Sequence, residues 1–160
     1  MELQYTWADG SNPEFAHFYR ITEDYYSALV GGKKNRKGFV PYNLSECVET
    51  VLIVTDQDKP AACAGLKRYS QTDAEIKRVW VEPAYRRKHI AVKMMQMLEE
   101  RALQQGYQRT ILQTRAIMKD AVQLYTGLGY HLIENYPPYD KLEGAVCYAK
   151  ELLPVKRGDE

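Results

Sequence analysis

The chain has 160 residues, of which 45% are hydrophobic, and its 22 Lys and Arg against 21 Asp and Glu give a formal net charge of +1 at pH 7. This length favours one domain spanning residues 1–160, and the balanced charge argues against a nucleic-acid-binding surface over the whole protein. No apolar run approaches a membrane span, and three scattered cysteines without a Cys/His cluster suggest neither disulfides nor a metal site, so a cytoplasmic protein is expected.

The first half of the chain predicts a strand, a helix and a meander. A short strand is expected at Leu3–Trp7, and Asn12 followed by Pro13 is typical of an N-cap with proline at the first helical position. An aromatic helical stripe should end at Gly31-Gly32, and the basic stretch 33–37 is a solvated turn or a site that attracts an anionic partner. Three antiparallel strands are then expected, at Val51–Thr55, Ala61–Tyr69 and Ala74–Val81.

The second half alternates helices and strands. The predicted elements are a helix from about Lys88 to Gly106, a strand at Arg109–Thr114, a helix at Asp120–Leu128, and strands at Tyr130–Ile133 and Ala145–Leu152. Helix and strand thus follow the meander in alternation. This order predicts a mixed α/β fold, in which a mostly antiparallel sheet contains a central strand–helix–strand crossover and is flanked by helices.

The junction between the third meander strand and the long helix is the most informative segment. The strand stops before Pro83, and the basic run Arg86-Arg87-Lys88-His89 leads into the helix. A helix start presents free N–H groups and a partial positive charge, so additional cations are poorly placed there unless an anion binds. The junction therefore predicts a ligand that carries phosphates.

Three segments in order resemble the GNAT superfamily of acyl-CoA-dependent N-acyltransferases. Ala74–Pro83 looks like the central strand of that family, Arg86–Ala91 resembles its pyrophosphate loop R/Q-x-x-G-x-G/A, and Ala121–Tyr130 resembles A-x-x-L-Y-x-x-x-G-F/Y. The similarity covers roughly residues 51–152. It implies acetyl-CoA as cosubstrate, released as coenzyme A, and no metal.

Two positions depart from the family pattern. His89 stands at the first glycine of the loop, where glycine permits close backbone approach to phosphates. If His89 adopts an ordinary helical conformation, its N–H can still donate while the side chain turns away. Met118 stands where many relatives have an asparagine that contacts the cofactor, so one polar contact is in doubt.

The resemblance implies which residues bind the cosubstrate. The pantetheine arm would pair with the backbone of the central strand, which requires this strand and its parallel neighbour to splay apart. The pyrophosphate would bind the basic loop and the first helical turn. The implied contacts are Val79, Trp80, Val81, Arg86, Arg87, Lys88, His89, Ile90, Ala91 and Val92.

Amine acetylation requires a base, an oxyanion donor and an acid for the leaving thiolate. By resemblance, the backbone N–H of Val79 is the oxyanion donor. Glu75 is the candidate base, directly or through a water, because it lies four residues earlier on the same side of a regular strand and matches an acidic family position. An ion pair of Glu75 with Lys77 or Arg68 is the structural alternative.

Tyr125 is the candidate acid, because it matches the family tyrosine near the thioester sulfur; a packed aromatic is the alternative. Acceptor contacts are expected, by resemblance, in the first helix and in the loop before the last strand. Tyrosines that lie there are Tyr25, Tyr26, Tyr136 and Tyr139, although some could simply be packing.

The expected function is direct transfer of an acetyl group from acetyl-CoA to a primary amine on a small molecule or a peptide. The alternative is a non-catalytic CoA-binding regulatory module, for which His89 and Met118 leave room and against which Glu75 and Tyr125 argue. An unrelated phosphate-binding protein ranks lower, because Walker and GxGxxG patterns are missing. Relatives often dimerise, so a homodimer is also considered.

Overall fold

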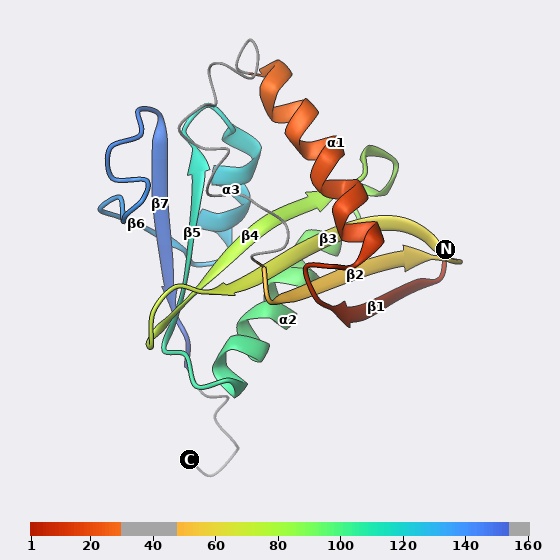
Figure 1. Ribbon diagram of the computed structural model, residues 1–160, viewed down its shortest axis with the longest axis horizontal. Helices are drawn as coiled ribbons and strands as arrows, with labels where there is room; N and C mark the ends of the chain where they lie inside the picture. The colour runs from red at the N-terminus through yellow and green to blue at the C-terminus, as the bar shows by residue number, and fades with distance from the viewer. Residues whose placement is uncertain (30–47, 154–160) are drawn as a thin grey trace.

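Within residues 1–29 and 48–153, which the computed structural model describes apart from the side chains of 26–29, seven strands form one sheet in the order β1-β2-β3-β4-β5-β7-β6 (Figure 1). The strands are β1 (Leu3–Ala8), β2 (Thr50–Asp56), β3 (Lys59–Arg68), β4 (Asp73–Val81), β5 (Arg109–Arg115), β6 (His131–Ile133) and β7 (Ala145–Glu151). Each pair of neighbours is antiparallel except β4 and β5, which are parallel.

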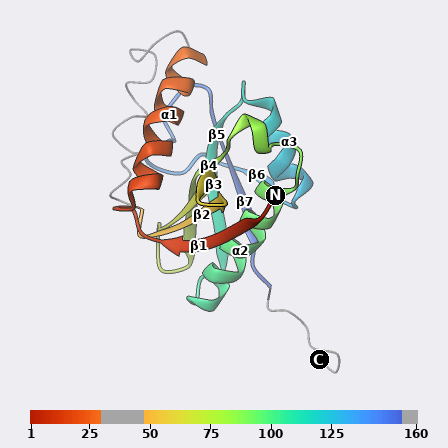
Figure 2. The same cartoon turned by 90° about the vertical axis from the view of Figure 1, so that its right-hand side faces the viewer.

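Helices cover both faces of the sheet. Helix α1 (Pro13–Leu29) lies on one face, and α2 (Ile90–Gln104) and α3 (Lys119–Gly127) lie on the other (Figure 2). Helix α2 is the crossover that joins β4 to β5, which a parallel pair requires. Among the described residues, no helix combines the length and the apolar character needed to cross a bilayer.

Residues of β2 show why the centre of the sheet is apolar on both sides. Val51 and Ile53 pack beneath α1 with Phe15 and Phe18, whereas Leu52 and Val54 belong to the larger cluster that α2 and α3 cover. All four β2 residues are buried, so the sequence there is a continuous apolar run rather than an alternating one. A third cluster lies beneath the C-terminal loop and includes Tyr139 and Cys147.

The architecture predicted from the sequence is confirmed, and the described element ends lie within two residues of the expected ones. The N-cap is also confirmed, because Oδ1 of Asn12 accepts hydrogen bonds from the main-chain N–H groups of Glu14 (2.9 Å) and Phe15 (3.1 Å). The expected helix end at Gly31-Gly32 and the basic stretch 33–37 lie outside the described residues.

Candidate active site

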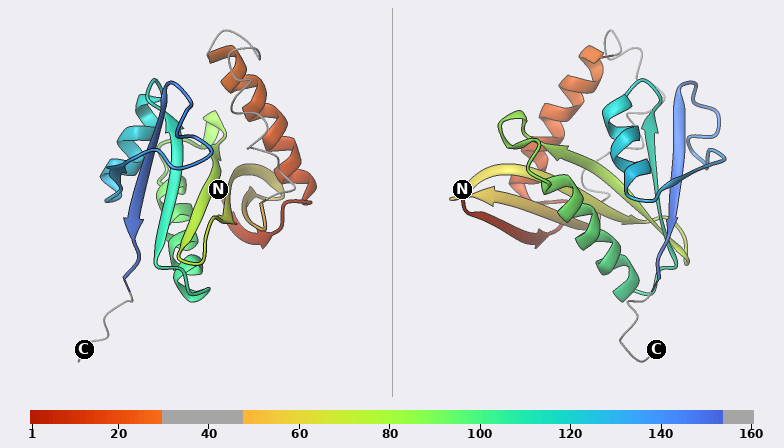
Figure 3. Two further views of the ribbon diagram at one scale, coloured as in Figure 1. Left: turned by 60° about the vertical axis from the view of Figure 1, so that its left-hand side comes forward. Right: turned by 180° about the vertical axis from the view of Figure 1, so that it is seen from behind.

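The parallel strands β4 and β5 are joined over only three residue pairs. These pairs are Asp73 with Arg109, Ala74 with Thr110, and Glu75 with Ile111. Beyond the last pair the rest of β4 and the rest of β5 are not paired with each other, and their ribbons separate (Figures 1 and 3). We call this segment the β4–β5 divergence. It confirms the expected splaying of the central strand and its parallel neighbour.

A short connection leads from the open end of β4 to α2. A 3₁₀ turn occupies Pro83–Tyr85, and both Arg87 (φ 63°) and His89 (φ 62°) adopt left-handed backbone conformations before α2 begins at Ile90. The helix therefore starts two residues later than expected. The ordinary helical conformation considered for His89 is not the one it adopts, because this residue is the left-handed N-cap that turns the chain into the helix.

The basic side chains of this connection have different environments. Nε of Arg86 donates a 2.8 Å hydrogen bond to the carbonyl of Val81, and the Arg86 guanidinium lies 4.9 Å from the ring centroid of Trp80. Arg86 is thus tied to the end of β4. Arg87 and Lys88 are exposed beside the start of α2, where they add positive potential to that of the free helical N–H groups.

A β-bulge interrupts β4 within the divergence. Opposite Cys63 and Gly65 of β3 lie Trp80 and Lys77, so β4 contains one additional residue between these pairs. Because of this residue, Val79 packs into the cluster beneath α2, whereas Glu75 meets the C-terminal loop on the other side. The expectation that Glu75 and Val79 share one side of a regular strand is therefore wrong.

Glu75 is buried, with 5% of its surface exposed, in a polar cluster. Oε2 of Glu75 accepts a 2.7 Å hydrogen bond from the Tyr136 hydroxyl, and Nζ of Lys77 lies 3.9 Å from Oε1. The same Nζ donates a 2.7 Å bond to the hydroxyl of Tyr139. The ion pair considered as an alternative role for Glu75 is thus present with Lys77. It is not formed with Arg68, whose guanidinium lies over the ring of Tyr107.

The tyrosines of this cluster stay protonated at neutral pH. Burial raises the pKa of Tyr136 well above its ordinary value, and the nearby Glu75 charge and the shared hydrogen bond raise it further. Burial and the Glu75 charge likewise raise the pKa of Tyr139. The Tyr136 hydroxyl can therefore remain a hydrogen-bond donor to the carboxylate over the physiological range.

Tyr125 lies on the opposite side of the sheet from this cluster. It is buried in the core beneath α2 and α3, and its ring centroid lies 6.0 Å from that of Tyr130. Helix α3, which carries Tyr125, stands behind the β4–β5 divergence in Figure 1. Its N-cap is Met118, whose sulfur accepts a long 3.9 Å contact from the hydroxyl of Thr114.

The expected acceptor residues divide into two groups. Tyr25 is 43% exposed on α1, and its ring meets that of Trp80 edge-on at 5.2 Å. Tyr136 and Tyr139 gather at Glu75 and Lys77 instead, and the side chain of Tyr26 lies outside the described part of the chain.

The family model described as Acetyltransferase (GNAT) family matches residues 7–130. The chain belongs to the GNAT family. This membership confirms the family resemblance that the sequence indicated.

Relatives and solved structures agree with this assignment. The uncharacterized N-acetyltransferase YsnE of Bacillus subtilis is 30% identical over 97 residues, which are 59% of this chain and 64% of that protein. The uncharacterized N-acetyltransferase YjgM of Escherichia coli is 36% identical over 66 residues, 41% of this chain and 40% of its own length. The match thus spans less than two thirds of each of these curated relatives.

Two solved structures confirm the fold. The proposed acyl-CoA N-acyltransferase from Klebsiella pneumoniae has a TM-score of 0.79 at 22% identity, with 94% of this chain and 98% of that chain covered. The PaiA N-acetyltransferase from Thermoplasma acidophilum, solved with coenzyme A, has a TM-score of 0.73 at 12% identity, with 94% and 99% covered.

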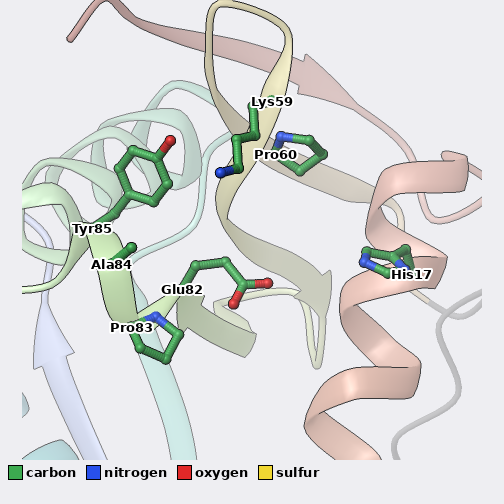
Figure 4. Close-up of a pocket in the computed structure, with 7 residues that line it drawn as sticks. All are labelled: His17, Lys59, Pro60, Glu82, Pro83, Ala84 and Tyr85. Atoms are coloured by element: carbon green, nitrogen blue, oxygen red, sulfur yellow. The ribbon is translucent and has the colours of Figure 1, made fainter.

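A cavity of about 460 Å³ in this GNAT protein was not anticipated from the sequence. It lies between α1, the start of β3 and the connection after β4, and Figure 4 shows the Glu82 carboxylate directed toward the His17 side of it. The lining residues are His17, Lys59, Pro60, Glu82, Pro83, Ala84 and Tyr85. They come from three separate segments, so no local pattern could have revealed them. Among the described residues, no cluster of His, Cys, Asp and Glu could hold a metal ion.

Proposed function

We propose that this GNAT protein, as one domain spanning residues 1–160, transfers an acetyl group from acetyl-CoA to a primary amine by direct attack. The observation that supports this most strongly is the β4–β5 divergence, which leads to the left-handed turn and the exposed cations at the start of α2. Main-chain groups for a pantetheine arm and N–H donors for a pyrophosphate thus follow one another along the chain. The PaiA relative, solved with coenzyme A, has the same fold.

The cosubstrate in this proposal binds mainly to the backbone. Its pantetheine amides pair with the edge of β4 from Val79 through Val81, which the divergence leaves without a β5 partner. The pyrophosphate accepts hydrogen bonds from the N–H groups of the His89–Val92 turn, and Arg87 and Lys88 supply counter-charge. Arg86 contributes to cosubstrate binding indirectly, because its hydrogen bond to the Val81 carbonyl fixes the conformation of the end of β4.

The reaction begins with a neutral amine, although a free alkylamine has a pKa of about 10.4. Glu75 accepts the amine proton through a water. Four strand residues at roughly 3.3 Å each place the Cα atoms of Glu75 and Val79 about 10–13 Å apart, farther than a glutamate side chain reaches. The Val79 N–H hydrogen-bonds the oxyanion as the amine nitrogen attacks the thioester carbon.

Collapse of the tetrahedral intermediate breaks the carbon–sulfur bond and releases the thiolate of coenzyme A. Tyr125 supplies a proton to this sulfur from the α3 side of the sheet and regains one from solvent, while the proton lost by the amine leaves through Glu75 to solvent. The contribution of Tyr125 is modest, because a thiol with a pKa of roughly 8.5 is already a fair leaving group. Tyr25, Tyr26, Tyr136 and Tyr139 are the residues that we propose for acceptor binding, and the acceptor is a small or peptidyl amine.

The test is an acetyl-CoA consumption screen over mixed amines, with release of free thiol as the signal. Calorimetric titration with coenzyme A, ATP and NAD runs in parallel. The proposal is supported if coenzyme A gives a heat of binding, ATP and NAD give none, and thiol is released only when an amine is present. Binding of coenzyme A without turnover of any amine would favour the regulatory module, and no heat with coenzyme A would reject the proposed function.

A further inference from the structure

The bulge residue Arg78 has an unusual backbone. Its φ of 55° is left-handed, a strained conformation that residues with a long L side chain rarely adopt. It lies where the register between β3 and β4 shifts, in the middle of the β4–β5 divergence. Such a conformation persists only where surrounding contacts determine it, so the contacts of Arg78 show what stabilises the bulge.

Helix α1 holds the Arg78 side chain, which is only 5% exposed. Nη1 donates a 3.2 Å hydrogen bond to the hydroxyl of Thr22, and Nη2 forms an ion pair with the carboxylate of Glu23. The guanidinium carbon also lies 4.3 Å from the ring centroid of Tyr19. A hydrogen bond, an ion pair and a cation–π contact thus hold this one side chain of β4 against α1.

A contact from β3 fixes the main chain of the same residue. The thiol of Cys63 donates a 3.4 Å hydrogen bond to the carbonyl oxygen of Arg78. Burial raises the pKa of Cys63, so its thiol remains a protonated donor. The Arg78 carbonyl therefore points toward the Cys63 thiol, on the α1 side of β3.

The direction of this carbonyl sets the direction of the next N–H. Among the described residues the cis peptide bond is Pro137–Pro138, so the Arg78–Val79 bond is trans, and its C=O and N–H point in opposite directions. Strand β4 lies between β3 and β5. With the carbonyl toward the Cys63 thiol of β3, the Val79 N–H is directed away from β3, toward the side on which β4 and β5 separate.

We propose that Arg78 and Cys63 are positioning residues for acetyl transfer, which aim the Val79 N–H at the oxyanion by holding the Arg78–Val79 peptide from its two sides. This inference rests on the proposed function and adds to it a link between α1 and the reacting carbonyl. Neither side chain needs to touch the substrate, because both act through one peptide group.

The test compares Arg78→Gly with wild type, since glycine accepts the left-handed conformation without strain but lacks the side chain that α1 holds. Two readouts are used: the Val79 amide signal in ¹⁵N-valine-labelled protein without ligand, and kcat alongside the Kd for coenzyme A. We expect a broadened Val79 signal and a kcat at least 10-fold lower, with Kd changed less than about threefold. Cys63→Ala should act in the same direction, with Cys63→Ser restoring most of the loss.

Arg109→Ala is the matched control, because it removes another strand arginine that is ion-paired, to Asp73 at 2.9 Å, at the closed end of the pairing. If Arg78→Gly lowers the melting temperature but leaves kcat unchanged, the arginine is structural and the inference is overturned. If only the KM for the amine rises, the arginine is an acceptor contact and the inference is overturned as well. Absence of coenzyme A binding and turnover in wild type would instead reject the proposed function, whatever the Val79 signal does.

Discussion

The Tyr136 hydroxyl donates a 2.7 Å hydrogen bond to Oε2 of Glu75, and the two residues are 61 positions apart in the sequence. The loop between β6 and β7 therefore reaches back to the last β4 residue that is paired with β5. The carboxylate that we propose as base thus has a defined orientation at the closed end of the β4–β5 divergence. Any acceptor bound there would approach a wall that contains Tyr136.

Glu75→Gln should lower kcat about 100-fold or more, because an amide cannot take the amine proton. The Kd for coenzyme A should stay the same. Steady-state kinetics from pH 6 to 10 measure this effect, and the loss of kcat should shrink as the pH approaches the amine pKa of about 10.4, where the amine is already neutral without a base.

Glu99→Gln is a close control for that variant. Glu99 of α2 also has a tyrosine hydroxyl and a lysine as partners, Tyr130 and Lys150, both at 2.9 Å. Loss of the Glu99 carboxylate should reduce the free energy of unfolding without lowering kcat. If the Glu75 variant behaves in the same way and its pH–rate profile is unchanged, Glu75 is an ion-pair residue and not the base.

Tyr125→Phe should slow turnover several-fold while coenzyme A binds almost as tightly as before, because only the proton donor is removed. Single-turnover thiol release and calorimetry measure the two effects. Tyr148→Phe, another buried tyrosine of the same core cluster, serves for comparison and should retain full activity. Weakened binding or unfolding of the Tyr125 variant would assign this residue to packing.

Tyr136→Phe should change how stability depends on alkaline pH. Above a pH of about 10 the unfolded chain releases the Tyr136 proton, whereas the raised pKa keeps it bound in the folded chain. The free energy of unfolding should therefore fall with rising pH by up to about 1.4 kcal/mol per unit more in wild type than in the variant. Urea titrations between pH 8 and 11 measure this slope, with the exposed Tyr25→Phe for reference; equal slopes in all three proteins would contradict the prediction.

His89→Gly should strengthen coenzyme A binding by about two- to fivefold, because glycine adopts the left-handed conformation at no cost and leaves room for phosphate. His89→Val should weaken binding, since a β-branched residue resists positive φ. Asp58→Gly is the control, because it changes a residue with φ of 68° in the β2–β3 turn. Equal affinities of wild type and both His89 variants would show that the backbone there does not contact the ligand.

The course of the sheet could be predicted because its signals are local. The Asn12-Pro13 start of α1, the apolar run of β2 and the glycine after α2 each depend on a few neighbouring residues. The order of strand, helix and strand then predicted the crossover between β4 and β5. Where a feature depended on residues close in sequence, the prediction and the structure agree within two positions.

The features that were missed depend on non-local contacts or on backbone angles. The bulge at Arg78 is stabilised by α1 and Cys63, and no strand pattern reveals partners that lie so far away. The left-handed angle at His89 was missed, although the glycine that the family pattern has at this position is the residue that adopts positive φ most readily. The cluster of Tyr136 with Glu75 depends on the path of a whole loop, for which the sequence predicted only contacts with the acceptor.

The three-pair contact between β4 and β5 has a consequence for amide exchange. It divides the sheet into β1–β4 and β5–β7, so few main-chain bonds connect the two parts directly. A bound pantetheine arm, which would hydrogen-bond to Val79–Val81 through its amides, would connect these two parts of the sheet like an additional strand. Deuterium uptake at the edge of β4 would then report occupancy, and the nucleotide-free enzyme would be the looser form of the sheet.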